Sequence, residues 1–153
     1  MTGRIVVILI GLSVWIYGTN ALEFTDCGSK VGKFTKVQVS DCVTTSTACI
    51  LKKNTNATIS IDFELSTIDQ CTKVTAVVHG VVMGIEMPFN LPNADGCLNS
   101  GITCPIQKGS NYEYSTTLPV LKQYPKVKVD VKWELIDENK DVIVCVMIPA
   151  KIQ

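Results

Sequence analysis

Seven cysteines are the residues of this chain whose chemistry is easiest to predict. They are Cys27, Cys42, Cys49, Cys71, Cys97, Cys104 and Cys145. No two of them have the Cys-x-x-Cys spacing of a structural zinc site or a thioredoxin-type redox centre, so the pattern favours disulfides. The pairs Cys42–Cys49 and Cys97–Cys104 each enclose six mostly small or polar residues. Such short loops close readily, and each bridge would stabilise the fold by about 2–3 kcal/mol on the loop-entropy estimate.

A third bridge would join the two ends of the domain. Cys27 and Cys145 are the outermost cysteines, and a bridge between them leaves Cys71 over. We expect Cys71 to be a buried or semi-buried free thiol rather than a nucleophile, because nothing near it in the sequence would lower its pKa.

Candidate catalytic groups are few. His79 is the only histidine, and no G-x-S-x-G turn accompanies it to supply the nucleophile of a Ser/His/Asp triad. We therefore expect His79 to be a buried, hydrogen-bonded structural residue. The acids lie singly on polar strand positions, apart from Asp137 and Glu138 in a turn, and nothing indicates the paired acids of a glycosidase. With no phosphate loop and no metal-ligand cluster either, we expect no enzyme, no cofactor and no metal.

The first 21 residues have the pattern of a signal peptide. Arg4 precedes an apolar run over 5–17, and small residues follow at Thr19 and Ala21. The run is shorter than the roughly 20 residues that a spanning helix needs. We therefore expect cleavage after Ala21, a secreted protein, and one domain over residues 22–153. Arg4 is the only arginine, so this domain would have 13 lysines against 14 acids, a charge of 13 − 14 = −1. It lacks the basic surface of a nucleic-acid-binding protein.

Strand patterns dominate the rest of the chain. VKVDVKWEL (127–135) places valines, Trp133 and Leu135 on one side and charged residues on the other. Similar strands are predicted at FTKVQVS (34–40), ATISIDFEL (57–65), SNYEYSTTLPVL (110–121) and DVIVCVMIPAKI (141–152). KVTAVVHGVVMGIEM (73–87) is apolar on both sides, which is typical of a central or doubly covered hairpin. About seven strands with turn signals between them predict an all-β, immunoglobulin-like antiparallel sandwich of two sheets.

Several motifs resemble one known family. D-C-G-S (26–29), V-V-H-G (77–80), D-G-C (95–97), C-P-I (104–106) and L-P-V…Y-P…W (118–133) are similar to the ML-domain family of lipid-recognition proteins. The resemblance covers essentially all of the chain after residue 21, with six cysteines in register. It implies an apolar tunnel between the two sheets and the non-enzymatic binding and transfer of a sterol. The alternatives are a carrier of fatty acids or other small apolar ligands, and a sandwich that recognises a protein or a bacterial lipid.

The resemblance also implies roles for individual residues. The family's lipid-lining positions correspond to Phe89, Pro119, Val120, Tyr124, Trp133 and Val146, where Val146 replaces an aromatic residue. Ile85 and Met87 match an apolar loop that docks on a membrane sterol transporter, although Glu86 replaces a proline between them. Asn56 begins the only N-x-S/T sequon and matches a glycosylation site. The implied protein is a monomeric glycoprotein, extracellular or lysosomal, that makes transient contact with membranes.

Overall fold

The computed structural model describes residues 22–43 and 45–153, so the expected signal peptide lies outside the described residues. The described part of the chain is all-β. Its strands are β1 (Thr25–Asp26), β2 (Gly32–Val39), β3 (Cys49–Leu51), β4 (Thr55–Leu65), β5 (Gln70–Cys71), β6 (Thr75–Val82), β7 (Ile85–Phe89), β8 (Ile106–Gln107), β9 (Asn111–Val120), β10 (Lys128–Ile136) and β11 (Val142–Ile152). Seven of these strands have five or more residues, and the other four have two or three. In this part of the chain, no helix long and apolar enough to cross a bilayer is found.

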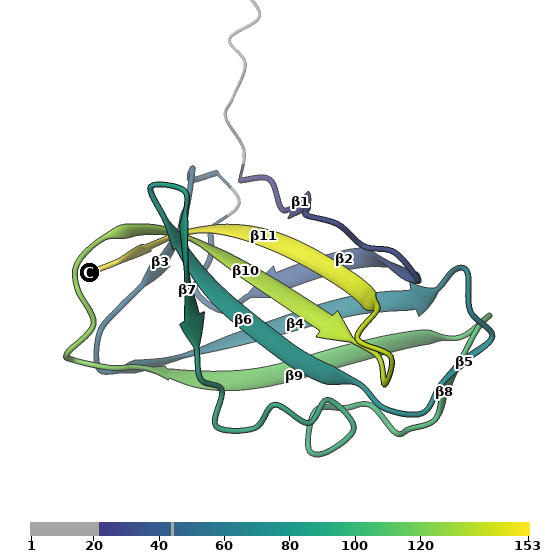
Figure 1. The fold of residues 1–153 in the computed structure, drawn as a ribbon. Coiled ribbons are helices and arrows are strands. Elements are labelled where there is room, and N and C mark those ends of the chain that lie inside the picture. Colours follow the sequence, from purple (N-terminus) through teal and green to yellow (C-terminus); the bar gives the residue numbers. More distant parts are fainter. Residues whose placement is uncertain (1–21, 44) are drawn as a thin grey trace, which may run out of the picture.

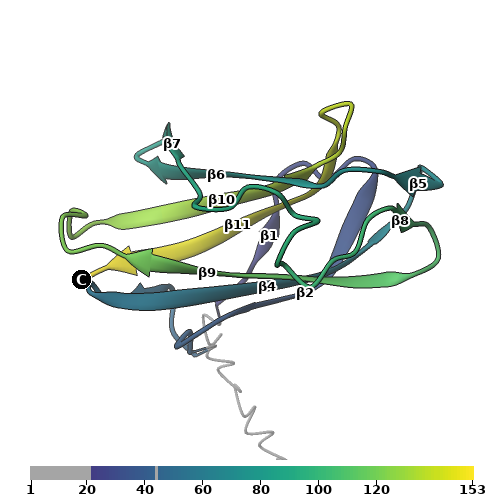
Figure 2. The ribbon, with the colours of Figure 1, turned by 90° about the horizontal axis from the view of Figure 1, so that it is seen from below.

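Two main sheets face each other (Figures 1 and 2). The larger sheet has the order β1-β11-β10-β6-β7 with β3 added to β11, the smaller has the order β2-β4-β9, and β5 and β8 form a separate pair. The predicted sandwich is thereby confirmed. One pairing departs from the antiparallel expectation, because β3 runs parallel to β11. The chain leaves β2 in one sheet and enters β3 in the other, so this connection crosses between sheets instead of closing a hairpin.

The alternating strands bury the predicted faces. On β10, Val129, Trp133 and Leu135 are buried while Lys128 and Asp130 on the opposite face are exposed. The inward positions of β4, from Ile59 to Leu65, are all buried. The strands thus present apolar side chains to the space between the sheets.

The irregular spacing of Phe34 and Val37 on β2 also has a structural cause. The register against β4 shifts between Phe34 and Lys36. A β-bulge at this point brings both apolar side chains to one face of the strand although they are three positions apart.

The hairpin of β6 and β7 is more exposed than predicted. β6 lies inside the larger sheet, but β7 is its edge strand and has a burial pattern that is almost entirely exposed. The turn residue Met83 is 97% exposed, and Ile85 and Met87 are 67% and 50% exposed. The expectation of a hairpin covered on both faces is therefore wrong for β7, since no element packs over this edge.

Three disulfides hold the sandwich: Cys27–Cys145, Cys42–Cys49 and Cys97–Cys104. Cys71 is free and buried. Its thiol donates a hydrogen bond to the carbonyl oxygen of Lys73 at 2.9 Å. Burial raises the pKa of Cys71 to about 12, and the nearby Glu138 carboxylate adds to this effect. The thiol is therefore protonated at neutral pH and unreactive as a nucleophile.

Candidate functional site

A cavity of about 490 Å³ opens between the two main sheets. Its walls come from β2, β4 and β9 of the smaller sheet, from β3, β6, β7, β10 and β11 of the larger sheet, and from the connection 121–127 that joins β9 to β10 (Figure 1). Most lining residues are Val, Ile, Leu, Ala or Pro. Such a volume is typical of small-molecule sites, and an apolar surface of this kind favours an apolar ligand over water.

Small inward side chains leave this space open. The positions of the larger sheet that line the cavity include Val78, Gly80 and Val82 on β6, Val129 and Val131 on β10, and Ala150 on β11. These side chains are too short to meet those of the opposite sheet, while the disulfides and the strand pairing hold the sheets in place. The cavity is therefore a consequence of side-chain volume within a regular strand pattern.

The mouth of the cavity is marked by lining residues that are also exposed to solvent. Met87, Pro119 and Lys126 are of this kind. Phe89 and Tyr124 lie beside them, with ring centroids 6.0 Å apart and ring planes at 73°. This edge-to-face contact joins β7 to the 121–127 connection across the mouth.

Trp133 forms the floor of the cavity. It is 2% exposed, and its ring centroid lies 6.1 Å from that of Tyr114, which is 1% exposed. Burial raises the pKa of Tyr114 to about 12, and hydrogen bonding to the Thr116 and Trp133 side chains opposes this effect. Below this layer, Ile61, Phe63 and Leu135 fill the core completely.

Five of the six predicted lipid-lining residues line the cavity: Phe89, Pro119, Val120, Tyr124 and Trp133. Val146 does not. It is fully buried, lies opposite Trp133 in the register of β10 and β11, and is not among the lining residues. The structure thus brings the five together in one cavity, and their contact with a ligand stays a prediction.

Many residues that line the cavity were not predicted from the sequence. The lining residues it did not select include Val39, Leu51, Ala57, Val78, Leu118, Ile148 and Ile152. Strand alternation assigns several of them to inward faces, but it does not separate positions that line a cavity from positions that pack in a core.

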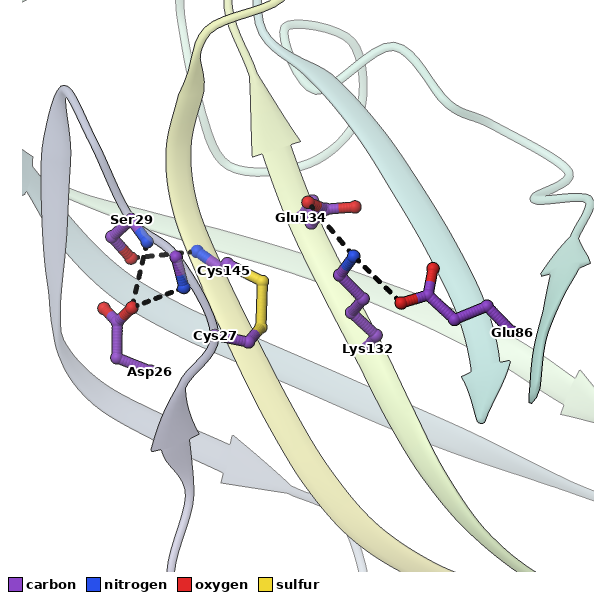
Figure 3. A network of polar contacts seen from close by, with 8 residues as sticks. Asp26, Cys27, Ser29, Glu86, Lys132, Glu134 and Cys145 are labelled. Carbon is purple, nitrogen blue, oxygen red and sulfur yellow. Dashed lines mark hydrogen bonds and ion pairs between the residues drawn. A yellow bond between two sulfur atoms is a disulfide. The ribbon is translucent and has the colours of Figure 1, made fainter. Parts of the chain in front are cut away.

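His79 differs from its prediction. Its register partner is Lys132, whose ammonium group lies 3.3 Å from Glu86 and 3.8 Å from Glu134 on the outer face of the sheet (Figure 3). Directly opposite residues share a face, so the His79 side chain points outward and its main chain contributes to the cavity wall. Among the described residues, His79 Nδ1 is one of two buried side-chain nitrogens without a hydrogen-bond partner. The expected hydrogen bond is absent at this atom.

The D-C-G-S segment has a structural role. The Asp26 carboxylate accepts hydrogen bonds from the Gly28 and Ser29 N–H groups at 2.8 and 2.9 Å, and the Ser29 hydroxyl accepts one from the Cys145 N–H group at 2.9 Å (Figure 3). Burial works against ionisation of Asp26, but the hydrogen bonds from Ser29 and Gly28 lower its pKa overall. This network holds the first strand beside the Cys27–Cys145 bridge.

A disulfide-bonded sandwich that keeps an apolar cavity between its sheets defines a class of lipid-recognition folds, and comparison with known proteins gives the family. The ML-domain profile matches residues 21–152, and the chain belongs to the ML-domain family. It is 54% identical over 145 residues to NPC intracellular cholesterol transporter 2 homolog a of Drosophila melanogaster, covering 95% of this chain and 97% of the relative. It is 43% identical over 132 residues to NPC intracellular cholesterol transporter 2 of Bos taurus, covering 86% and 85%.

A solved structure agrees with these relatives. The crystal structure of a Niemann-Pick type C2 protein from Japanese carpenter ant superposes with a TM-score of 0.82 at 34% identity. The match covers 86% of this chain and all of the ant protein. The chain therefore has the same fold as this solved member of the family over most of its length.

Proposed function

We propose that this protein binds a sterol or a closely related lipid in the cavity and transfers it without catalysis. The observation that carries the proposal is the cavity itself, about 490 Å³ of space with an almost entirely apolar wall. Transfer of a lipid from water into such a space gains about 0.8 kcal/mol per buried methylene, before the costs of immobilisation. No covalent step is needed, and no ligand charge has to be buried.

The relatives support the choice of a sterol. The Drosophila melanogaster and Bos taurus proteins are named as cholesterol transporters, and both align over nearly the whole of this chain after the expected signal peptide. A fatty acid is the second candidate, because a flexible chain also fits a space bounded by small aliphatic side chains. The runner-up function is a sandwich that recognises a protein or a bacterial lipid through its surface.

The hairpin of β6 and β7 is the proposed docking element for a membrane sterol transporter. Met87 lies at the mouth of the cavity, and Ile85 and Met83 extend the same exposed apolar edge. A lipid that leaves through the mouth would pass this edge, so a partner that covers it would receive the lipid away from water.

Secretion and glycosylation belong to the same proposal. Asn56 is exposed on β4, opposite Pro119, where a glycan would reach solvent. Cleavage after Ala21 would release the domain into the secretory pathway, and from there to the extracellular space or the lysosomal lumen.

Treatment of protein from a eukaryotic host with an N-glycosidase should increase its electrophoretic mobility, and Asn56→Gln should have the same effect without treatment. Unchanged mobility in both tests would contradict occupancy of this site.

Organic extraction of the purified protein followed by mass spectrometry tests the central proposal. We expect close to one sterol or fatty acid per protein molecule, and much less from Val120→Phe, which places a ring in the cavity. A clean extract from protein made in several sterol-containing hosts would instead favour the surface-recognition alternative.

A further inference from the structure

The opening of the cavity carries a charge that the rest of its wall does not. Among the described residues that line the cavity, Lys126 is the one with a formal charge at neutral pH, and no aspartate or glutamate lines it. His79 also lines the cavity, but its side chain points to the outer face of the sheet. Lys126 is exposed and lies at the mouth, in the connection 121–127. The cavity is therefore apolar inside and cationic at its opening.

No acid is paired with this lysine. Three ion pairs join described residues, and none of them includes Lys126. Glu86 is the acid of the β6–β7 hairpin beside the mouth, and the Lys132 ammonium group holds it at 3.3 Å on the outer face of the sheet (Figure 3). Asp130, the nearest acid along the chain, is exposed and does not line the cavity. The Lys126 ammonium group is thus available to a ligand at the mouth.

Two further lysines add positive charge to the same rim. The Ile152 N–H group donates to the Val127 carbonyl oxygen at 2.9 Å, so the end of β11 lies beside the connection 121–127. Lys128 and Lys151 are register partners on β10 and β11, and both are exposed. Like charges directly opposite each other destabilise a sheet. A positive rim that is kept at this cost favours an anionic group at the mouth.

From this arrangement we infer that the cavity selects an apolar ligand with one anionic group at its end, which stays at the mouth beside Lys126 while the apolar body fills the cavity. The inference rests on the proposed function and narrows its ligand class. A long-chain fatty acid and a sulfated sterol share this chemistry. The anionic group keeps its contact with water at the exposed mouth, so its charge is not buried. The Tyr124 phenol lines the same cavity and can donate a hydrogen bond to it.

Two matched pairs of lipids separate this inference from simple apolar binding. The first pair is oleate and oleyl alcohol, and the second is cholesterol sulfate and cholesterol. Within each pair the apolar body is the same and only the charge of the end group differs. Affinities are measured by tryptophan emission of the delipidated protein, at lipid concentrations below those at which the lipids aggregate. The quantity that is compared between proteins is the affinity for the anionic member divided by the affinity for the neutral member.

Three lysine variants test the residue. Lys126→Met removes the ammonium group and keeps an apolar stem, and we expect it to lower this ratio about three- to fivefold in at least one pair. Lys126→Arg keeps the charge and should keep the ratio. Lys108→Met is the matched control, because Lys108 is exposed, follows β8 and does not line the cavity. It removes the same charge from the protein and should leave both ratios unchanged.

Salt gives an independent readout. Raising sodium chloride from about 50 mM to about 500 mM should lower the ratio in the unmodified protein and lower it less in Lys126→Met. An effect confined to the oleate pair would identify a carboxylate as the selected group, and one confined to the sterol pair would identify a sulfate. The inference is overturned if all four lipids bind and Lys126→Met leaves both ratios unchanged, or if Lys108→Met lowers them equally. If none of the four lipids binds, the proposed function fails and the inference fails with it.

Discussion

The two ends of the sandwich use the same strands for opposite purposes. At the end where β9 passes into β10, the inward residues of the larger sheet include several Val, a Gly and an Ala, and they line a cavity. At the other end the inward residues include Phe63 and Tyr112, whose ring centroids lie 5.9 Å apart, together with Leu135, and they fill the core. Trp133 lies at the boundary. The alternation of polar and apolar residues is equally regular at both ends, so side-chain volume rather than pattern decides where the sheets enclose space.

The largest expected effect is at the filled end. Phe63→Ala removes a fully buried ring from a close-packed region. We expect the free energy of unfolding to fall by about 3–5 kcal/mol. Affinity for cholesterol in the protein that remains folded should change little, because Phe63 does not line the cavity. Denaturant unfolding and a sterol-binding assay measure the two effects. A large loss of affinity without a loss of stability would mean that Phe63 belongs to the binding cavity and not to the filled core.

A matched pair of valines compares the ends directly. Val120→Phe adds a ring at the open end, where it enters the cavity, and Val144→Phe adds the same ring at the filled end. We expect Val120→Phe to weaken sterol binding at least tenfold with little change in stability. Val144→Phe should overpack the core and cost about 1–3 kcal/mol. Equal destabilisation by both changes would mean that the two ends are packed alike.

Alkaline pH should destabilise the folded protein because a buried thiol and a buried phenol resist ionisation in it. In the folded protein the pKa values of Cys71 and Tyr114 are raised to about 12 from 9.0 and 10.0. Above pH 9 the unfolded chain therefore loses protons that the folded protein keeps, and stability falls as the pH rises from about 9 to 12. The Cys71 share should be about 1 kcal/mol at pH 10. Unfolding measured from pH 8 to 11 should show a shallower decline for Cys71→Ala, and an identical decline would exclude Cys71 as a cause.

A change at the mouth should have a modest effect on both stability and affinity. Phe89 is half-buried, and one side of its ring faces the cavity. Phe89→Ala widens the mouth and removes the contact with Tyr124, so we expect a loss of about 1 kcal/mol in stability and a severalfold weaker affinity for cholesterol. Faster dissociation of bound sterol in stopped-flow measurements would accompany the weaker affinity. Unchanged dissociation would show that Phe89 does not restrict the exit.

The strand pattern predicted the sandwich because each of its signals is local. The alternation in β10 and β4 depends only on neighbouring residues, and the bulge in β2 explains the one irregular spacing. The exposed edge at β7 could not be predicted, because residues 73–87 look the same whether another element covers them or not. For the same reason, the sequence predicted that Val131 and Leu135 face inward without showing that only Val131 lines the cavity. That distinction depends on the residues opposite, which long-range pairing brings together.

Titration of the delipidated protein with cholesterol while recording tryptophan emission tests the central claim most directly. Trp133 is the only tryptophan after residue 21, and it lies in the cavity wall. Its emission therefore reports on the boundary between the open and filled ends. We predict a saturable change in the intensity or wavelength of emission at close to one sterol per protein, displaced to higher sterol concentration in Val120→Phe. Emission that stays constant with cholesterol and with a long-chain fatty acid, in protein shown to be folded and free of lipid, would contradict a lipid-binding cavity.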